Sequence, residues 1–170
     1  ATGPGPDAEY SLPPGRLDTP SSLILEGGPV RYTTDNSPPD RYAALYTAPL
    51  SLNRTITVKS RTYLEGSLPG YTRANTYFVN EHSFTLPVVS LSLDPDHLYD
   101  PMIGIHVRGI NGTAGYCGDV ANWYQDWERP AYFEYFDESG QRQVAQQIGV
   151  KMAGGCTRGR DQKAMSLYAR

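Results

Sequence analysis

The sequence predicts a mostly β protein: an immunoglobulin- or fibronectin-like β-sandwich followed by a β-rich partial domain. Two observations lead to this fold class. Apolar and polar residues alternate over short segments, as in strands with one buried face, and clusters of Gly, Pro, Asn and Asp separate these segments. Amphipathic helix periodicity is nearly absent. Because 170 residues suffice for two small modules, we place one at residues 1–79 and the other at residues 80–170.

The first module is expected to hold short antiparallel strands with a turn about every ten residues. The clearest strand is 55–63, where strict alternation puts four side chains on one face: Ile56, Val58, Ser60 and Thr62. Further expected strands of this module are 22–26, 30–34 and 71–79. In the last of these, Tyr77 and Val79 are expected to face the same way.

The segment from Asp35 to Pro39 separates two of these strands and is rich in turn-forming residues. Asp and Asn side chains hold tight turns through hydrogen bonds to nearby backbone amides, and Asn tolerates a positive φ. We therefore interpret Asp35 and Asn36 as turn residues rather than as ligand-binding residues.

Four short motifs of the first module occur in an order that resembles a known family. They read YTTDNSPP at 32–39, LY and PL at 45–50, TVKSR at 57–61 and TYFV at 76–79. Together they resemble the chitobiase/β-hexosaminidase C-terminal domain over about residues 8–79, with Asn36 and Ser60 where that family usually has Gly and Ala. The resemblance implies an immunoglobulin-like sandwich attached to secreted enzymes or bacterial cell-surface proteins.

The second module begins with an expected strand at 86–93 and a helical turn. Asp94 is placed to cap this turn, and Pro95 takes the first helical position, where a missing amide proton is tolerated. Alternation predicts another strand at 103–109. Residues 110–127 lack a clear period and are expected to form a loop, pinned to the core by Trp123 and Trp127.

A hairpin is the strongest local prediction in the second module. Residues 131–136 alternate, residues 137–140 form a Gly-containing turn, and residues 144–152 return, with Ile148, Val150 and Met152 on one face. A last strand is expected at 163–170.

Charge and cysteine content narrow the functional classes. The net charge of −3 gives no reason to expect a nucleic-acid partner, and no run of about 18 apolar residues indicates a membrane span. The sequence shows no metal-ligand spacing.

The two cysteines, Cys117 and Cys156, either form one disulfide in an oxidising compartment or remain free. The last twenty residues are basic, which suits either phosphate binding or a solvated strand edge.

Residues 84–170 resemble the front part of the CotH family, the spore-coat protein H kinases. The shared motifs, in order, are LPVVSL at 86–91, GIHV at 104–107, ANW at 121–123, WERP at 127–130, EYF at 134–136, GVKM at 149–152, GGCTR at 154–158 and QK at 162–163. The family usually has Arg just before the Gly pair, where this sequence has Met152 and Ala153. The resemblance implies the N-terminal lobe of a kinase-like fold whose full-length parent uses ATP and Mg²⁺ to phosphorylate Ser of partner proteins.

The CotH resemblance also suggests which residues would meet the nucleotide. It implies that Lys163 holds ATP phosphates from a strand, that Arg158 assists, and that the Gly154-Gly155 backbone approaches a phosphate. The alternative for both cations is surface charge beside a hairpin. Because the family's metal-binding and base carboxylates lie later in the chain, we assign no catalytic residue and no cofactor to this fragment.

The leading hypothesis is therefore a fragment of a secreted or surface CotH-type protein that is itself non-catalytic. The alternative is a non-enzymatic surface adhesion or carbohydrate-binding module in which the CotH-like part is a degenerate scaffold. A glycoside hydrolase accessory fragment is a third hypothesis, but no paired acids support it. The phosphorylated partner or surface ligand is not identified by the sequence.

Overall fold

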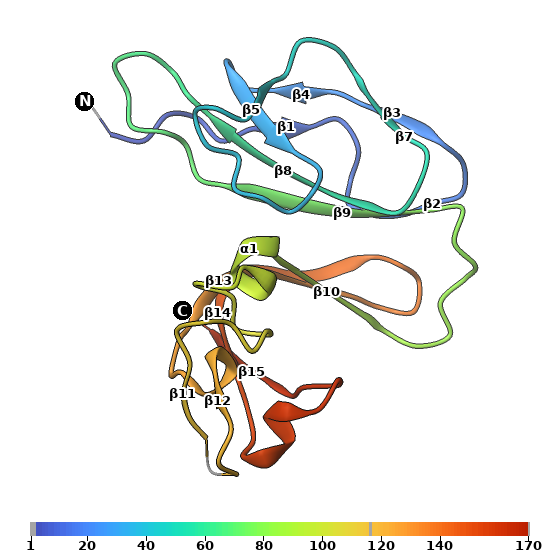
Figure 1. Cartoon of the computed structure of the whole chain (residues 1–170). Helices are drawn as coiled ribbons and strands as arrows, with labels where there is room; N and C mark the ends of the chain where they lie inside the picture. Colours follow the sequence, from blue (N-terminus) through green and yellow to red (C-terminus); the bar gives the residue numbers. More distant parts are fainter. Residues whose placement is uncertain (1–2, 116, 170) are drawn as a thin grey trace. The chain divides into compact units, whose positions relative to one another are not determined.

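The computed structural model describes residues 3–115 and 117–169, and it confirms the mostly β fold class (Figure 1). The chain divides into two compact units. The first unit contains the residues up to Ser90 and the segment Glu134–Ala145; the second contains Leu91–Phe133 and the residues from Gln146 onward. The predicted boundary between residues 79 and 80 stays a prediction, because the units reflect packing and assign 80–90 and 134–145 to the first unit.

The first unit contains a β-sandwich. One layer is a five-stranded sheet in the order β2-β9-β8-β5-β6, with bounds Gly15–Leu17, Arg73–Val79, Ile56–Thr62, Val30–Thr33 and Ala44–Leu45. The other layer consists of two antiparallel pairs, β1-β4 and β3-β7, with bounds Glu9–Tyr10, Leu25–Glu26, Ser21–Leu23 and Leu50–Leu52. Among the described strands of this sandwich, β2 and β9 pair in parallel, whereas β1-β4, β3-β7, β5-β6, β5-β8 and β8-β9 pair antiparallel.

The core of the sandwich follows from the alternation in β8. Val58, Ser60 and Thr62 are each 0% exposed, and Ile56 packs against the core cluster, so the predicted face is confirmed. Tyr77 and Val79 of β9 lie in the same cluster, as expected. Burial raises the pKa of Tyr77 to about 12, and its hydroxyl donates to the Leu12 carbonyl at 3.0 Å.

The turn after β5 has the predicted chemistry. The Asp35 carboxylate accepts hydrogen bonds from the Ser37 hydroxyl at 2.6 Å and from the Ser37 amide at 3.0 Å. These bonds hold the pKa of Asp35 below its usual range. Asn36 has φ 69°, the left-handed conformation that Gly and Asn adopt most readily.

The core of the second unit lies on the four-stranded sheet β10-β13-β14-β15, although part of β10, β13 and β14 belongs to the first unit. The bounds of these strands are Val88–Leu93, Arg129–Phe136, Arg142–Met152 and Met165–Ala169. The hairpin of β13 and β14 is confirmed, and Ile148, Val150 and Met152 are all at most 4% exposed. The helix α1, Pro95–Tyr99, begins as predicted, because the Asp94 side chain accepts a hydrogen bond from the Asp96 amide at 3.0 Å.

The predicted strand at 103–109 is wrong. The backbone of this segment bonds to the helix instead, since the Ile105 and His106 amides donate to the carbonyls of His97 and Leu98 at 2.9 Å each. Ile105 is nevertheless 1% exposed, so its alternating apolar pattern reflects burial in an irregular segment.

The expected loop at 110–127 contains short regular elements. These are a pair of two-residue strands, β11 (Thr113–Ala114) and β12 (Val120–Ala121), and a 3-10 turn, η1 (Asn122–Tyr124). A further 3-10 turn, η2 (Cys156–Gly159), follows β14. Trp123 and Trp127 both pack against the second core, as predicted. Within the described ranges, no helix is long and apolar enough to cross a membrane.

Candidate functional site

Asn122 shapes the irregular part of the second unit, and sequence reasoning did not single it out. Its side chain is 0% exposed; the amide nitrogen donates to the Pro101 and Gly104 carbonyls at 3.0 and 3.2 Å, and the oxygen accepts from the Asn111 amide at 3.1 Å. A Cβ at Gly109, where φ is +60°, would overlap the Asn122 side chain at 2.0 Å. These hydrogen bonds therefore hold the backbone of residues 101–111 against Asn122, the residue just before Trp123.

Trp123 brings together the two cations that the CotH resemblance singled out. The Lys163 ammonium lies over the Trp123 indole ring, 4.5 Å from the ring centroid. The Arg158 guanidinium donates to the Trp123 carbonyl at 3.2 Å and to the Gly154 carbonyl at 2.6 Å. We call Trp123, Arg158 and Lys163 the Trp123 cation site. Among the described residues, neither cation of this site forms an ion pair with a carboxylate.

The position of Lys163 differs from the expectation in one respect. β15 begins at Met165, so Lys163 lies in the preceding loop rather than on a strand. Its ammonium also donates to the Arg160 carbonyl. An ammonium has three donors, so this bond leaves others for a ligand. The strand begins late because the β14-β15 pairing starts at Met152 opposite Met165.

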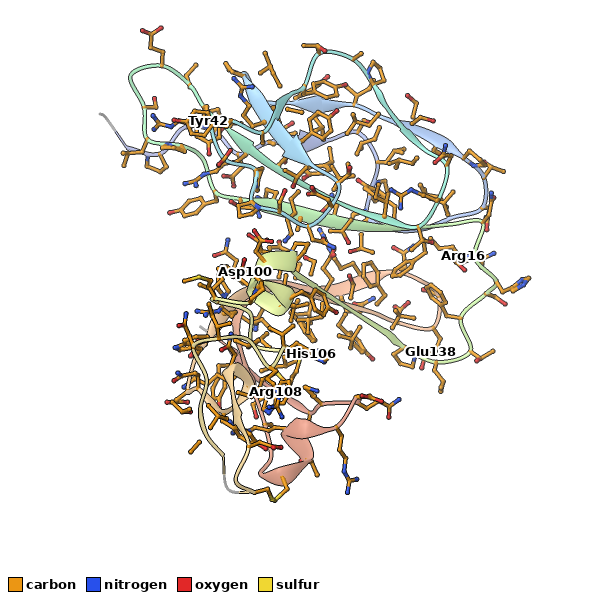
Figure 2. The ribbon with its side chains drawn as sticks, in the orientation of Figure 1. Arg16, Tyr42, Asp100, His106, Arg108 and Glu138 are labelled. Carbon is orange, nitrogen blue, oxygen red and sulfur yellow. A yellow bond between two sulfur atoms is a disulfide. The ribbon has the colours of Figure 1, made fainter. Side chains whose placement is uncertain are left out.

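The pKa of His106 reflects the positive charge at the Trp123 cation site. Burial lowers the pKa of His106, and the nearby charge of Lys163 lowers it further. The imidazole also makes an edge contact with the Tyr99 ring, with centroids 5.8 Å apart. Figure 2 labels His106 and Arg108, and Arg108 is paired with Asp119 at 3.6 Å. The positive charge beside His106 thus comes from Lys163, which has no acidic partner among the described side chains.

The structure also shows where the other residues predicted for this region lie. Cys117 and Cys156 are joined in a disulfide with a Cα–Cα distance of 5.4 Å, which links the β11-β12 loop to the turn that carries Arg158. Gly154 has φ 94°, a conformation that favours glycine, and its carbonyl is bonded by Arg158. Asp161 is exposed. Within the described chain, no group of three His, Cys, Asp or Glu side chains is placed to hold a metal ion.

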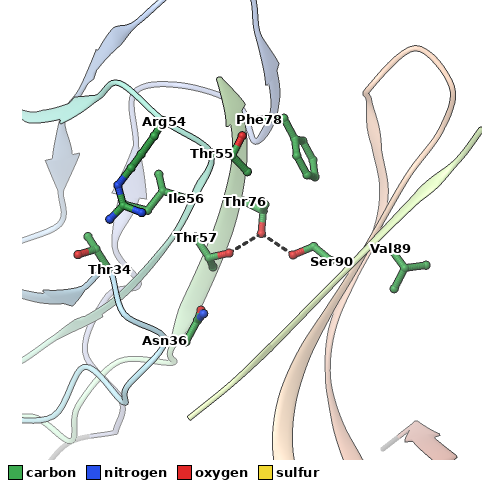
Figure 3. A pocket seen from close by; sticks show the side chains of 10 residues that line it. All are labelled: Thr34, Asn36, Arg54, Thr55, Ile56, Thr57, Thr76, Phe78, Val89 and Ser90. Carbon is green, nitrogen blue, oxygen red and sulfur yellow. Dashed lines mark hydrogen bonds between the residues drawn. The ribbon is translucent and has the colours of Figure 1, made fainter. Parts of the chain in front are cut away.

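A second site lies in the first unit, on the face of the five-stranded sheet that points away from the sandwich core. It is a pocket of about 360 Å³ whose described lining residues are Thr34, Asn36, Arg54, Thr55, Ile56, Thr57, Thr76, Phe78, Val89 and Ser90 (Figure 3). Sequence reasoning missed it, because it combines residues of the β5-turn segment, β8, β9 and β10. The alternation of Thr55 and Thr57 at the start of β8 is the signal that was present.

A buried ion pair supports the floor of this pocket. Glu134 is 0% exposed, and Arg142 donates to its carboxylate at 2.8 Å. The other carboxylate oxygen of Glu134 accepts from the Thr76 hydroxyl at 2.5 Å. Arg142 also donates to the Asn75 side chain at 2.7 Å. These bonds hold Thr76 in one orientation at the base of the pocket.

Comparisons with known proteins bear on the first unit. No match was found among curated proteins, and none among solved structures. The narrower resemblances, to the chitobiase/β-hexosaminidase C-terminal domain and to the CotH family, therefore stay predictions. One family model does match: residues 24–77, which form most of the sandwich, are similar to the family described as Fn3 associated.

Proposed function

We propose that the second unit binds the phosphates of ATP as part of a longer CotH-type protein. One observation supports this most directly: Arg158 and Lys163 converge on Trp123, and neither meets a carboxylate among the described residues. Cations without anionic neighbours attract a phosphate, and Arg and Lys are the residues that bind phosphates most often. In this proposal Lys163 supplies a point charge and Arg158 supplies a second, planar donor.

The setting of the two cations strengthens their attraction for an anion. Lys163 and Arg158 are both half-buried, and the Lys163 charge lies against an indole face rather than in open water. An electrostatic interaction is stronger where the surroundings exclude water. Arg158 is also held by two backbone carbonyls, so little conformational freedom remains to be lost when a phosphate binds.

Phosphoryl transfer needs carboxylates that hold Mg²⁺ and one that orients the attacking hydroxyl. Among the described residues of the second unit, two carboxylates are already paired with cations. Asp119 is paired with Arg108, and Asp126 is paired with Lys151 at 2.9 Å. We therefore derive no transfer step and propose nucleotide binding without turnover for these residues.

We also propose a secreted or cell-surface location for this protein. The disulfide between Cys117 and Cys156 supports this, because disulfides form and persist in oxidising compartments. The match of residues 24–77 to the Fn3 associated family is consistent with a surface module.

The same match favours a second candidate function. In it the chain is a non-enzymatic surface adhesion or carbohydrate-binding module, and the CotH-like part is a scaffold without nucleotide affinity. The two candidates differ in whether the Trp123 cation site binds ATP.

Calorimetric titration of the chain with ATP, with and without Mg²⁺, tests the proposal. We expect Lys163→Gln to weaken binding about tenfold, or about 1.4 kcal/mol. Arg160→Gln is the matched control: Arg160 is exposed two residues from Arg158, and we expect the loss of its charge to change affinity by less than about twofold. Equal losses in the two variants would indicate general surface charge. A folded chain that does not bind ATP would favour the adhesion function.

A further inference from the structure

The pocket of the first unit has a defined arrangement of donors and acceptors. The Glu134 carboxylate, paired with Arg142, accepts hydrogen bonds and cannot donate them. The Thr76 hydroxyl bonded to it must therefore use its single proton in that bond. Thr76 has no proton left for its other two contacts.

This fixes the direction of two further hydrogen bonds. Thr57 lies 2.9 Å and Ser90 lies 2.8 Å from the Thr76 hydroxyl oxygen, as the dashed lines in Figure 3 show. Because Thr76 can only accept from them, both hydroxyls donate to it. Each then keeps its lone pairs for another partner. The buried ion pair thus orients Thr76, and Thr76 in turn orients Thr57 and Ser90, which line the pocket with lone pairs available as acceptors.

Arg54 supplies the opposite chemistry at the same pocket. Of the ten described residues that line it, Arg54 alone is charged, and the side chain is exposed. Among the described residues, its guanidinium has no hydrogen-bond or ion-pair partner. In the view of Figure 3, Thr57 lies between Arg54 and Thr76. The pocket therefore offers a planar cation on one side and hydroxyl acceptors on the other.

The apolar part of the lining is small. Ile56 and Phe78 are largely covered, whereas Val89 is 53% exposed. The volume of about 360 Å³ is at the lower end of the range of small-molecule sites, roughly 300–1,000 Å³. A ligand that fits has a compact body, hydroxyl groups that donate to Thr57 and Ser90, and an anionic group for Arg54.

We infer that this pocket binds a hydroxylated carboxylate, namely a uronic acid residue of a polysaccharide. Its ring hydroxyls donate to Thr57 and Ser90, and its carboxylate accepts a forked pair of hydrogen bonds from Arg54. The C–H groups of the sugar ring contact Val89. The inference does not depend on the Trp123 cation site, because the two sites share no residue.

The test is a titration of the chain with D-galacturonate, followed through the backbone amide signals by NMR. We expect the amides of Thr57 and Ser90 to shift with a dissociation constant of about 1 mM, typical of a few hydrogen bonds at one sugar. D-galactose lacks the carboxylate and acetate lacks the hydroxyls, so neither should shift these amides at the same concentration. Equal shifts with either compound would overturn the inference.

Two pairs of variants place the ligand. Arg54→Gln should weaken galacturonate binding about tenfold, whereas Arg41→Gln, which removes an exposed charge from another loop, should leave it unchanged. Thr57→Val should weaken binding about fivefold, and Thr57→Ser, which keeps the hydroxyl, should restore it. An equal effect of Arg54→Gln and Arg41→Gln would overturn the inference. Lys163→Gln should leave galacturonate binding intact. A failed inference at this pocket can therefore be distinguished from a failed proposal at the ATP site.

Discussion

Two charged clusters of this protein, one in each unit, are partnered in opposite ways. In the first unit, Glu134 is fully buried and each of its carboxylate oxygens is bonded, one to Arg142 and one to Thr76. In the second unit, Lys163 and Arg158 gather at Trp123 with backbone carbonyls and a ring as their neighbours. A buried charge with a full set of partners stabilises and orients its surroundings. Cations that converge without an anion are free to bind one.

The comparison also separates two kinds of stabilisation. The sandwich of the first unit depends on strands whose alternating side chains meet in one core. Among the described residues, the second unit has a smaller core cluster than the first, and it has a long irregular segment that buried Asn122 and a disulfide hold in place. Removing the buried ion pair, the disulfide or the Lys163 charge should break these differences, with effects that decrease in that order.

The buried ion pair should matter far more than a surface pair. Arg142→Met leaves the Glu134 charge buried and unpaired, so we expect the free energy of unfolding to fall by about 3–5 kcal/mol. The matched control is Arg73→Met, because Arg73 pairs with Asp7 through a side chain that is 52% exposed. That change should cost less than about 1 kcal/mol. Urea denaturation measures both.

A double variant sharpens the same point. Glu134→Leu combined with Arg142→Met removes both charges, and we expect most of the lost stability to return. If the double variant is as unstable as Arg142→Met alone, the cost comes from lost packing, and the buried charge is not its cause.

The disulfide should stabilise the second unit specifically. Cys117 and Cys156 are 39 residues apart in sequence, and replacing both by Ser should cost about 2–4 kcal/mol. Both tryptophans of the chain, Trp123 and Trp127, lie in this unit, so their fluorescence during denaturation reports on it. Adding a reductant to the wild-type chain should produce the same change, and the reductant should have no effect on the double variant. An unchanged fluorescence transition would contradict the prediction.

The smallest effect concerns His106. Its pKa is below the usual value near 6.5, first because of burial and second because of Lys163. Lys163→Gln removes the second cause, so the His106 pKa should rise but stay below its usual value. Titration of the imidazole signals by NMR measures the change, and Arg160→Gln should leave the pKa as it is. No rise in Lys163→Gln would mean that the Lys163 charge does not reach His106.

The lowered pKa of His106 also predicts the direction of the pH dependence of stability. The folded state favours the neutral imidazole, so its contribution to stability is complete above the unfolded pKa of about 6.5 and is lost as the pH falls through the folded pKa. In Lys163→Gln this loss should be smaller, because the folded and unfolded values lie closer together.

Sequence reasoning succeeded where local chemistry decides the structure. The alternation of Ile56, Val58, Ser60 and Thr62 correctly predicted the buried face of β8. Asp35 and Asn36 form the expected turn, and Asp94 caps the expected helix. Each of these features depends on residues within a few positions of one another, and a strand or turn reflects their order directly.

The predictions failed where contacts between residues far apart in sequence determine the local structure. The alternation of Ile103, Ile105 and Val107 suggested a strand. Backbone groups of this segment instead form hydrogen bonds with the helix α1 and with the Asn122 side chain. Lys163 was expected on a strand, although the pairing of Met152 with Met165 starts that strand two residues later. Neither competing contact is visible in the local pattern.

The sequence by itself determined the β class, the faces of the main strands and the chemistry of the turns. The tertiary structure alone decided which charges are paired and which remain available. Glu134 meets Thr76 across 58 residues, and Arg158 reaches Trp123 across 35. Local periodicity carries no information about such contacts, because they form only when separate elements pack together. The two candidate binding sites exist for this reason.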